Sequence, residues 1–305
     1  MRFQHIYRHL TLLNSAAAGL STLGVVYLYT QIFKPSSSSR TVTPVTYPMY
    51  DTLLAFGDSI TQLGSDPHIS GFVGNLAGYY SRRMDVLNRG FSGFNTKDAL
   101  EIVDQVFPKT ASPRRQTMSI NSMIRWPHHN DTFPKAAKGP RLCLLAFGAN
   151  DAALPFSQWH IPLNEFSDNL RQMVSLLHDP SSVYYSPDTR ILFITPPPIG
   201  DRMWEEDSKL HRRKADRKNA VTKKYADAVI TVAKELDLPY VDIWTAIESA
   251  VHNSTDSTPE AANSLDDGYK KYLNDGLHLT DKGNELLFDL IVKEIHNNWP
   301  ELNPY

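Results

Sequence analysis

The sequence predicts an α/β fold built on a mostly parallel sheet. From residue 51 onward, short apolar runs alternate with longer amphipathic stretches, a pattern typical of repeated βαβ units. The chain has 305 residues and is 41% hydrophobic, which is enough for one large core. Its single cysteine, Cys143, lies in an apolar run and excludes an internal disulfide framework. We therefore expect one domain over residues 51–305.

Five apolar runs are the expected strands, and they cover residues 52–56, 85–88, 141–147, 190–195 and 240–243. Between the last two, Val221, Tyr225, Val229 and Val232 recur every three or four residues. This spacing predicts a surface helix that packs on the sheet. The basic cluster Lys209–Lys218 precedes that helix, and we interpret it as a solvated, salt-bridged face in preference to an anion site.

The N-terminus has a different character. Residues 9–33 contain no Asp, Glu, Lys or Arg, and residues 20–33 are strongly apolar. We divide this part into an apolar segment, 1–34, and a linker, 35–50, rich in Ser, Thr and Pro. The first hypothesis is an uncleaved membrane anchor through residues 10–33. A cleaved secretion signal, a mitochondrial presequence and an amphipathic extension of a cytoplasmic protein stay open, and the flanking charges do not decide orientation.

Net charge and the spacing of potential metal ligands indicate which kinds of partner and cofactor to expect. A formal net charge of −2 gives no overall field that would attract nucleic acid, so we expect a small-molecule partner. Residues Lys109–Gly139 are polar and proline-containing, and we expect a long surface excursion. Its adjacent His128 and His129 lack the spacing of metal ligands. We expect neither a metal nor an organic cofactor.

A candidate nucleophile follows the first expected strand. In the stretch Phe56–Thr61, Ser59 comes after a glycine-containing turn, which presents a hydroxyl at the sheet edge and at the start of a helix. Helix capping alone would also explain an Asp-Ser pair there. The Gly-x-Ser-x-Gly elbow does not occur in the chain, which disfavours an α/β-hydrolase fold.

Two further segments follow expected strands in the same way. Gly93, in the stretch Asn88–Thr96, permits a backbone N–H to approach a ligand closely. Asn150, in the stretch Phe147–Asp151, carries an amide that can donate to an oxyanion. Ordinary turns would account for either residue taken alone.

A candidate base lies near the C-terminus. Asp275 and His278 are three residues apart, so the carboxylate can hold one ring nitrogen while the other faces a serine. The alternatives are an Asp-Gly turn and a histidine that is merely buried. Open α/β sheets bind ligands where strands end, and each of the four segments lies just after an expected strand or just before an expected helix.

Together these segments resemble the four blocks of the GDSL/SGNH hydrolase superfamily, with Ser59, Gly93, Asn150 and His278 at the positions that name it. Longer strings, 85–93, 147–152, 160–163 and 275–279, are similar to its isoamyl acetate-hydrolysing esterase branch. The resemblance covers residues 51–296. It does not include the apolar N-terminus or the Lys109–Gly139 excursion.

The resemblance implies a three-layer, flavodoxin-like α/β/α sandwich with a parallel sheet of about five strands. It implies a serine esterase in which Ser59 attacks the acyl carbonyl, His278 is the general base and Asp275 orients it. Ser59, Gly93 and Asn150 would form the oxyanion hole. The branch implies short-chain, acetate-type esters. A lipase, a thioesterase, a carbohydrate deacetylase and an inactive membrane-tethered binding protein are the alternatives.

Overall fold

The computed structural model describes residues 51–109, 139–253 and 268–304. The segment proposed as an anchor, the linker, His128 and His129 all lie outside these ranges, so the expectations about them stay predictions. Among the helices that the structure does describe, none combines the length and apolar character needed to cross a bilayer.

Five strands form one parallel sheet, in the order β2-β1-β3-β4-β5. Their bounds are β1 Asp51–Gly57, β2 Met84–Gly90, β3 Leu142–Ala146, β4 Arg190–Ile194 and β5 Tyr240–Val241. All five expected strands and the parallel, flavodoxin-like topology are therefore confirmed. Strand β5 is shorter than expected because Asp242 accepts a 3.0 Å hydrogen bond from the backbone N–H of Thr245 and so caps the following helix.

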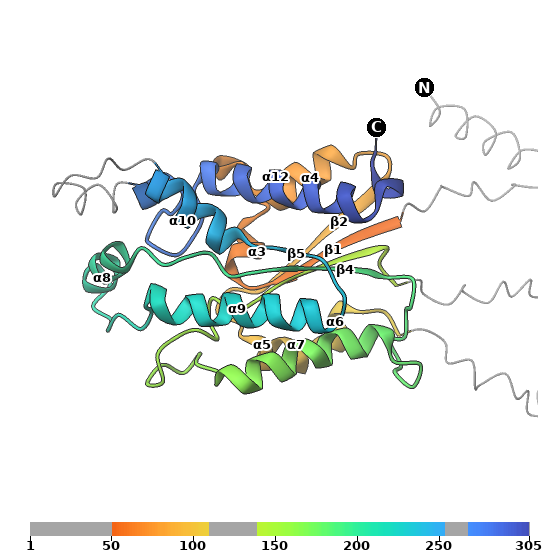
Figure 1. Cartoon of the computed structure of the whole chain (residues 1–305), viewed down its shortest axis with the longest axis horizontal. Coiled ribbons are helices and arrows are strands. Elements are labelled where there is room, and N and C mark those ends of the chain that lie inside the picture. The colour runs from red at the N-terminus through yellow and green to blue at the C-terminus, as the bar shows by residue number, and fades with distance from the viewer. Residues whose placement is uncertain (1–50, 110–138, 254–267, 305) are drawn as a thin grey trace, which may run out of the picture. The chain divides into compact units, whose positions relative to one another are not determined.

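Helices cover both faces of the sheet, which makes three layers (Figure 1). One face carries α4 Phe72–Tyr79, α10 Ile243–Asn253 and α12 Asp281–Asn298, and the other carries α5 Thr96–Glu101, α6 Val103–Val106, α7 Leu163–His178 and α9 Asn219–Glu235. The remaining short elements are α3 Ser59–Leu63, α8 Asp201–Leu210 and the 3₁₀ turns η2 Pro67–Ile69 and η5 Pro300–Leu302.

Alternate residues of each strand point into two separate cores. Leu53 and Ala55 of β1 pack with α4, α10 and α12, whereas Leu54 and Phe56 pack with α7 and α9. This period of two is what a strand buried on both faces requires. Cys143 is fully buried in the second core, where burial raises the pKa of its thiol and leaves it unreactive.

The topology also fixes where a ligand can bind. In this strand order β2 is added on one side of β1, and β3 and the later strands are added on the other side. Such a switch point, here between β1 and β3, opens a crevice at the carboxyl ends of the strands. Strand β1 runs into Ser59, β2 toward Gly93 and β3 toward Asn150. The fold therefore brings the first three expected site segments to one edge.

Candidate active site

Ser59 is the first residue of α3, directly after β1. Asp58 caps this helix by accepting a 2.9 Å hydrogen bond from the backbone N–H of Ile60. Helix capping and a nucleophilic serine are therefore compatible interpretations of this Asp-Ser pair, since Asp58 caps the helix and Ser59 presents its hydroxyl. Ser59 is mostly buried, with 9% of its surface exposed.

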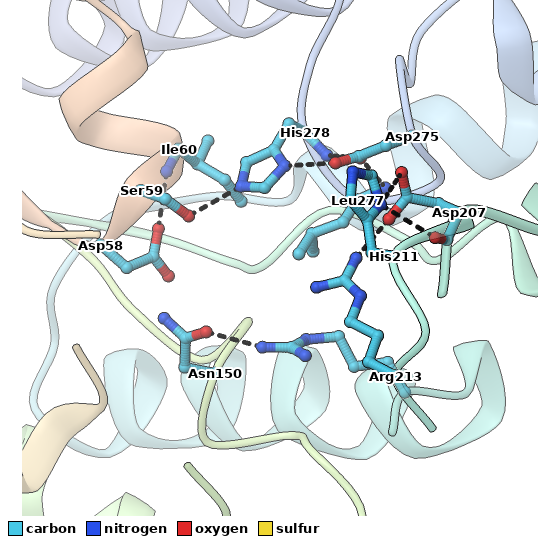
Figure 2. Close-up of polar contacts among 11 residues, drawn as sticks. Asp58, Ser59, Ile60, Asn150, Asp207, His211, Arg213, Asp275, Leu277 and His278 are labelled. Atoms are coloured by element: carbon cyan, nitrogen blue, oxygen red, sulfur yellow. Dashed lines mark hydrogen bonds and ion pairs between the residues drawn. The ribbon is translucent and has the colours of Figure 1, made fainter. Parts of the chain in front are cut away.

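The Ser59 hydroxyl lies 2.9 Å from Nε2 of His278 (Figure 2). On the other side of the ring, Nδ1 lies 2.7 Å from a carboxylate oxygen of Asp275. Residues separated by more than 200 positions in the chain are thereby joined in one line of hydrogen bonds. The spatial arrangement expected for Ser59, Asp275 and His278 is present.

The ionisation of Asp275 sets the tautomer of the histidine. Burial opposes the charge, but the hydrogen bond and charge of His278 and the backbone N–H groups of Leu277 and His278 outweigh it and hold the pKa of Asp275 at about 2. An ionised carboxylate only accepts, so Nδ1 carries the proton. Nε2 is then the acceptor, and the Ser59 hydroxyl donates to it.

A short loop carries this pair. Leu273 and Leu279 form an antiparallel bridge that closes it, and Asp275 accepts from the backbone N–H groups of Leu277 at 2.9 Å and His278 at 2.8 Å. Gly276 has φ +93°, and a Cβ there would lie 2.6 Å from the backbone nitrogen of Trp204. Glycine is required at this position by conformation and by space.

Asn150 and the Gly93 segment contact each other directly. Nδ2 of Asn150 donates a 2.8 Å hydrogen bond to the carbonyl of Phe94, the residue after Gly93. Gly93 itself has φ +83°, a conformation that favours glycine. The backbone N–H of Ser92 donates to the side chain of Gln62 in α3 at 2.9 Å, which ties this segment to the helix that begins at Ser59. Figure 2 shows the amide of Asn150 turned toward Asp58.

Three ionisable side chains at this edge are buried and were not predicted as part of the site. Burial raises the pKa of Asp58 to about 6 and that of Asp151 to about 7. Asp151 accepts from the backbone N–H of Thr96 at 2.9 Å and from its hydroxyl. The third is Arg217, 3% exposed, whose Nη2 donates to Oδ1 of Asn150 at 2.7 Å.

The interpretation of the Lys209–Lys218 cluster was therefore wrong for one member. Arg213 and Lys218 pair with Asp207 and Glu205 at the surface, as a salt-bridged face requires. Arg217 instead points inward. The spacing of the basic residues offers no signal for this difference, because the cluster from residue 211 onward lies in the loop between α8 and α9, which has no helical period.

In the part of the chain that the structure describes, the side chains offer no set of metal ligands. There, no group of three His, Cys, Asp or Glu side chains is placed to hold a metal ion.

A parallel sheet with a part-buried Ser-His-Asp line of hydrogen bonds at its carboxyl edge is the arrangement expected of an SGNH-type hydrolase. Residues 55–286 match the model of the GDSL-like lipase/acylhydrolase family. The chain belongs to this family, and it is an esterase/acylhydrolase of the GDSL type.

Individual relatives agree with this assignment. The human isoamyl acetate-hydrolyzing esterase 1 homolog is 34% identical over 263 residues, which are 84% of this chain and 87% of the relative. A GDSL esterase/lipase of Arabidopsis thaliana is 31% identical, with 84% and 91% covered. A mutant acetylxylan esterase from Geobacillus stearothermophilus shares the fold, with a TM-score of 0.50, 20% identity, and 81% and 94% covered.

The raised pKa of Asp151 predicts a pH-dependent stability. With an ordinary pKa of 3.8 when unfolded and about 7 when folded, this carboxyl keeps its proton only in the folded state between those values, so the free energy of unfolding falls as pH rises through the window. We expect Asp151→Asn to remove this contribution. In urea denaturation at pH 5, 6, 7 and 8, the variant should gain stability relative to the parent up to about pH 7 and then run parallel. A difference that is the same at every pH would contradict this.

Proposed function

We propose that this esterase hydrolyses small carboxylic esters, acetate-type esters first, through an acyl-enzyme on Ser59. The line of hydrogen bonds from Asp275 through His278 to the Ser59 hydroxyl is the observation that supports a nucleophilic serine. The name of the human relative, an isoamyl acetate-hydrolyzing esterase homolog, supports the choice of a short acyl group.

In the first step, Nε2 of His278 takes the proton of Ser59 as the hydroxyl oxygen attacks the ester carbonyl. The imidazolium that forms is stabilised by the ionised carboxylate of Asp275. The alcohol then leaves with the proton from His278. In the second step, water attacks the acyl group, His278 again takes the proton, and the acid is released.

Negative charge develops on the carbonyl oxygen in each step, and we assign its donors to the backbone N–H groups of Ser59 and Gly93 and to Nδ2 of Asn150. The amide of Asn150 has two N–H groups, and one of them is bound to the carbonyl of Phe94. The second is available for the oxyanion. Preorganised donors of this kind stabilise the transition state because they need no reorientation during the reaction.

The indole of Trp159 supports a short acyl group. A methyl group on Gly93 would lie 3.5 Å from the indole nitrogen, so the ring borders the proposed oxyanion hole. A large rigid ring beside the reacting carbonyl restricts the space for an acyl chain.

Replacement of the nucleophile is the first test. For Ser59→Ala, we expect kcat with p-nitrophenyl acetate to fall by about 10⁴- to 10⁶-fold, because among the residues that the structure describes Ser59 supplies the hydroxyl that is bonded to His278. The circular dichroism spectrum should be unchanged. A fluorophosphonate probe should label the parent at Ser59 and not the variant; an active, unlabelled chain would refute the acyl-enzyme, and an inactive, unlabelled parent would favour the tethered binding protein.

Asp275→Asn tests the control of the tautomer. An amide can donate to Nδ1, which would place the ring proton on Nε2 and leave no acceptor for the serine. We expect kcat to fall by as much as ~10⁴-fold near neutral pH. The melting temperature should change little, since an asparagine oxygen can still accept from the two backbone N–H groups. A loss below about tenfold would mean that another group holds the ring.

A series of p-nitrophenyl esters from acetate to decanoate tests the acyl length. We expect kcat/KM to be highest for the shortest acyl groups, and Trp159→Ala to move the preference toward longer chains by opening space at the hole. Trp299→Ala is the matched control, since this partly buried tryptophan lies after α12. A parent preference beyond about C8 would favour a lipid substrate instead, and equal rates with thioesters or acetylated sugars would favour those classes.

A further inference from the structure

The guanidinium of Arg217 is buried behind the amide of Asn150. Its side chain is 4% exposed and it donates to three acceptors: the carbonyl of Ala149 at 3.1 Å, Oδ1 of Asp216 at 2.7 Å and Oδ1 of Asn150 at 2.7 Å. Two of these acceptors belong to the segment that follows β3. The planar fork of an arginine is suited to such simultaneous contacts, and a lysine is not.

These contacts determine which way the Asn150 amide points. A guanidinium has donors and no acceptor, so the atom that faces Arg217 must be the amide oxygen. The carbonyl of Phe94 only accepts, so the atom that faces it must be Nδ2. The two partners together exclude the flipped amide, in which an N–H would face Arg217 and an oxygen would face the carbonyl.

The positive charge of Arg217 also favours the donor role of the Asn150 amide. Burial lowers the pKa of Arg217, and the nearby carboxylate of Asp216 opposes that effect; an arginine stays charged under such conditions. A cation on Oδ1 polarises the amide and strengthens its N–H groups as donors. Asp216 accepts from Nη1 of the guanidinium, whereas the amide oxygen accepts from Nη2, so the ion pair leaves the donor that holds Asn150 in place.

The rest of the environment holds the guanidinium in place. The other oxygen of Asp216 accepts from the Ser157 hydroxyl at 2.7 Å. The rings of Trp204 and Trp159 lie 5.0 and 5.6 Å from the guanidinium carbon, within the range of cation–π attraction. Buried ion pairs add little to stability compared with apolar side chains, so stability alone is a weak reason for this arrangement.

We infer that Arg217 is a positioning residue for catalysis: it fixes and polarises the Asn150 amide so that one N–H is aimed at the oxyanion. The inference rests on the proposed function of Asn150 as an oxyanion donor. It makes Arg217 part of the machinery that stabilises the transition state, although it does not touch the substrate.

A double-mutant cycle of Arg217→Gln and Asn150→Ala tests the inference, with p-nitrophenyl acetate as substrate and phenylboronic acid as an analogue that forms a tetrahedral anion on serine. For Arg217→Gln we expect kcat to fall about 10- to 100-fold, with KM changed by less than about threefold. Boronate binding should weaken by a similar factor. In the Asn150→Ala background the same substitution should cost almost nothing more.

Two further variants separate positioning from folding. Thr189→Val removes a buried 2.7 Å hydrogen bond to the carbonyl of Pro140 at the start of β4, the opposite end of the strands, and should lower the melting temperature without changing kcat. Arg217→Lys keeps the charge without the fork, and it replaces the glutamine variant in the cycle if that variant does not fold. We expect it to recover part of the lost kcat.

Additive losses in the cycle, or a kcat within about twofold of the parent, would overturn the positioning role while the esterase function stands. A parent that neither hydrolyses the ester nor reacts at Ser59 would overturn both.

Discussion

Parallel pairing of β1 with both of its neighbours is the constraint on which the site depends. Gly57 stands opposite Gly90 in β2 and opposite Ala146 in β3, so three segments leave the sheet at the same level. A Cβ on Gly90 would lie 2.0 Å from the backbone nitrogen of Gln62. Because that position has no side chain, α3 can lie against the end of β2, and its first residue, Ser59, lies above the sheet edge.

Ionisable side chains are buried at the same edge, although burial of such groups does not favour folding. Asp58, Asp151 and Arg217 are each at most 3% exposed, and the two carboxyls have raised pKa values because burial disfavours their ionised forms. Replacement by apolar side chains would often cost nothing in stability. Conflicts of this kind with the general rules of folding concentrate at functional sites, and here they surround the candidate nucleophile and the Asn150 amide.

The sequence was sufficient for the sheet and for the residues that follow its strands. Apolar runs identify buried strands whatever the tertiary contacts, and a polar side chain directly after such a run must lie at the carboxyl edge. For this reason the placement of Ser59 and Asn150 at this edge could be predicted, whereas Gly93 was singled out by the freedom of its backbone and not by a polar side chain.

Burial of the Arg217 side chain could not be predicted in the same way. Arg217 stands among Arg212, Arg213, Lys214 and Lys218, and nothing in that string distinguishes the side chain that turns inward from those that pair at the surface. Its partners, Ala149 and Asn150, are almost 70 positions away. Such a contact follows from how the loop before α9 meets the segment after β3, which is a property of the assembled fold.

The loop closed by Leu273 and Leu279 carries both the imidazole and the carboxylate that orients it, and its own backbone supplies the N–H groups that hold that carboxylate. Base and orienting group therefore form one hydrogen-bonded unit within a single loop. A shift of this unit would lengthen a single separation, Nε2 to the hydroxyl, while the ring kept its proton on the same nitrogen. The gap between Nε2 and the hydroxyl therefore depends on how this loop packs in the core that it shares with β1 and α3.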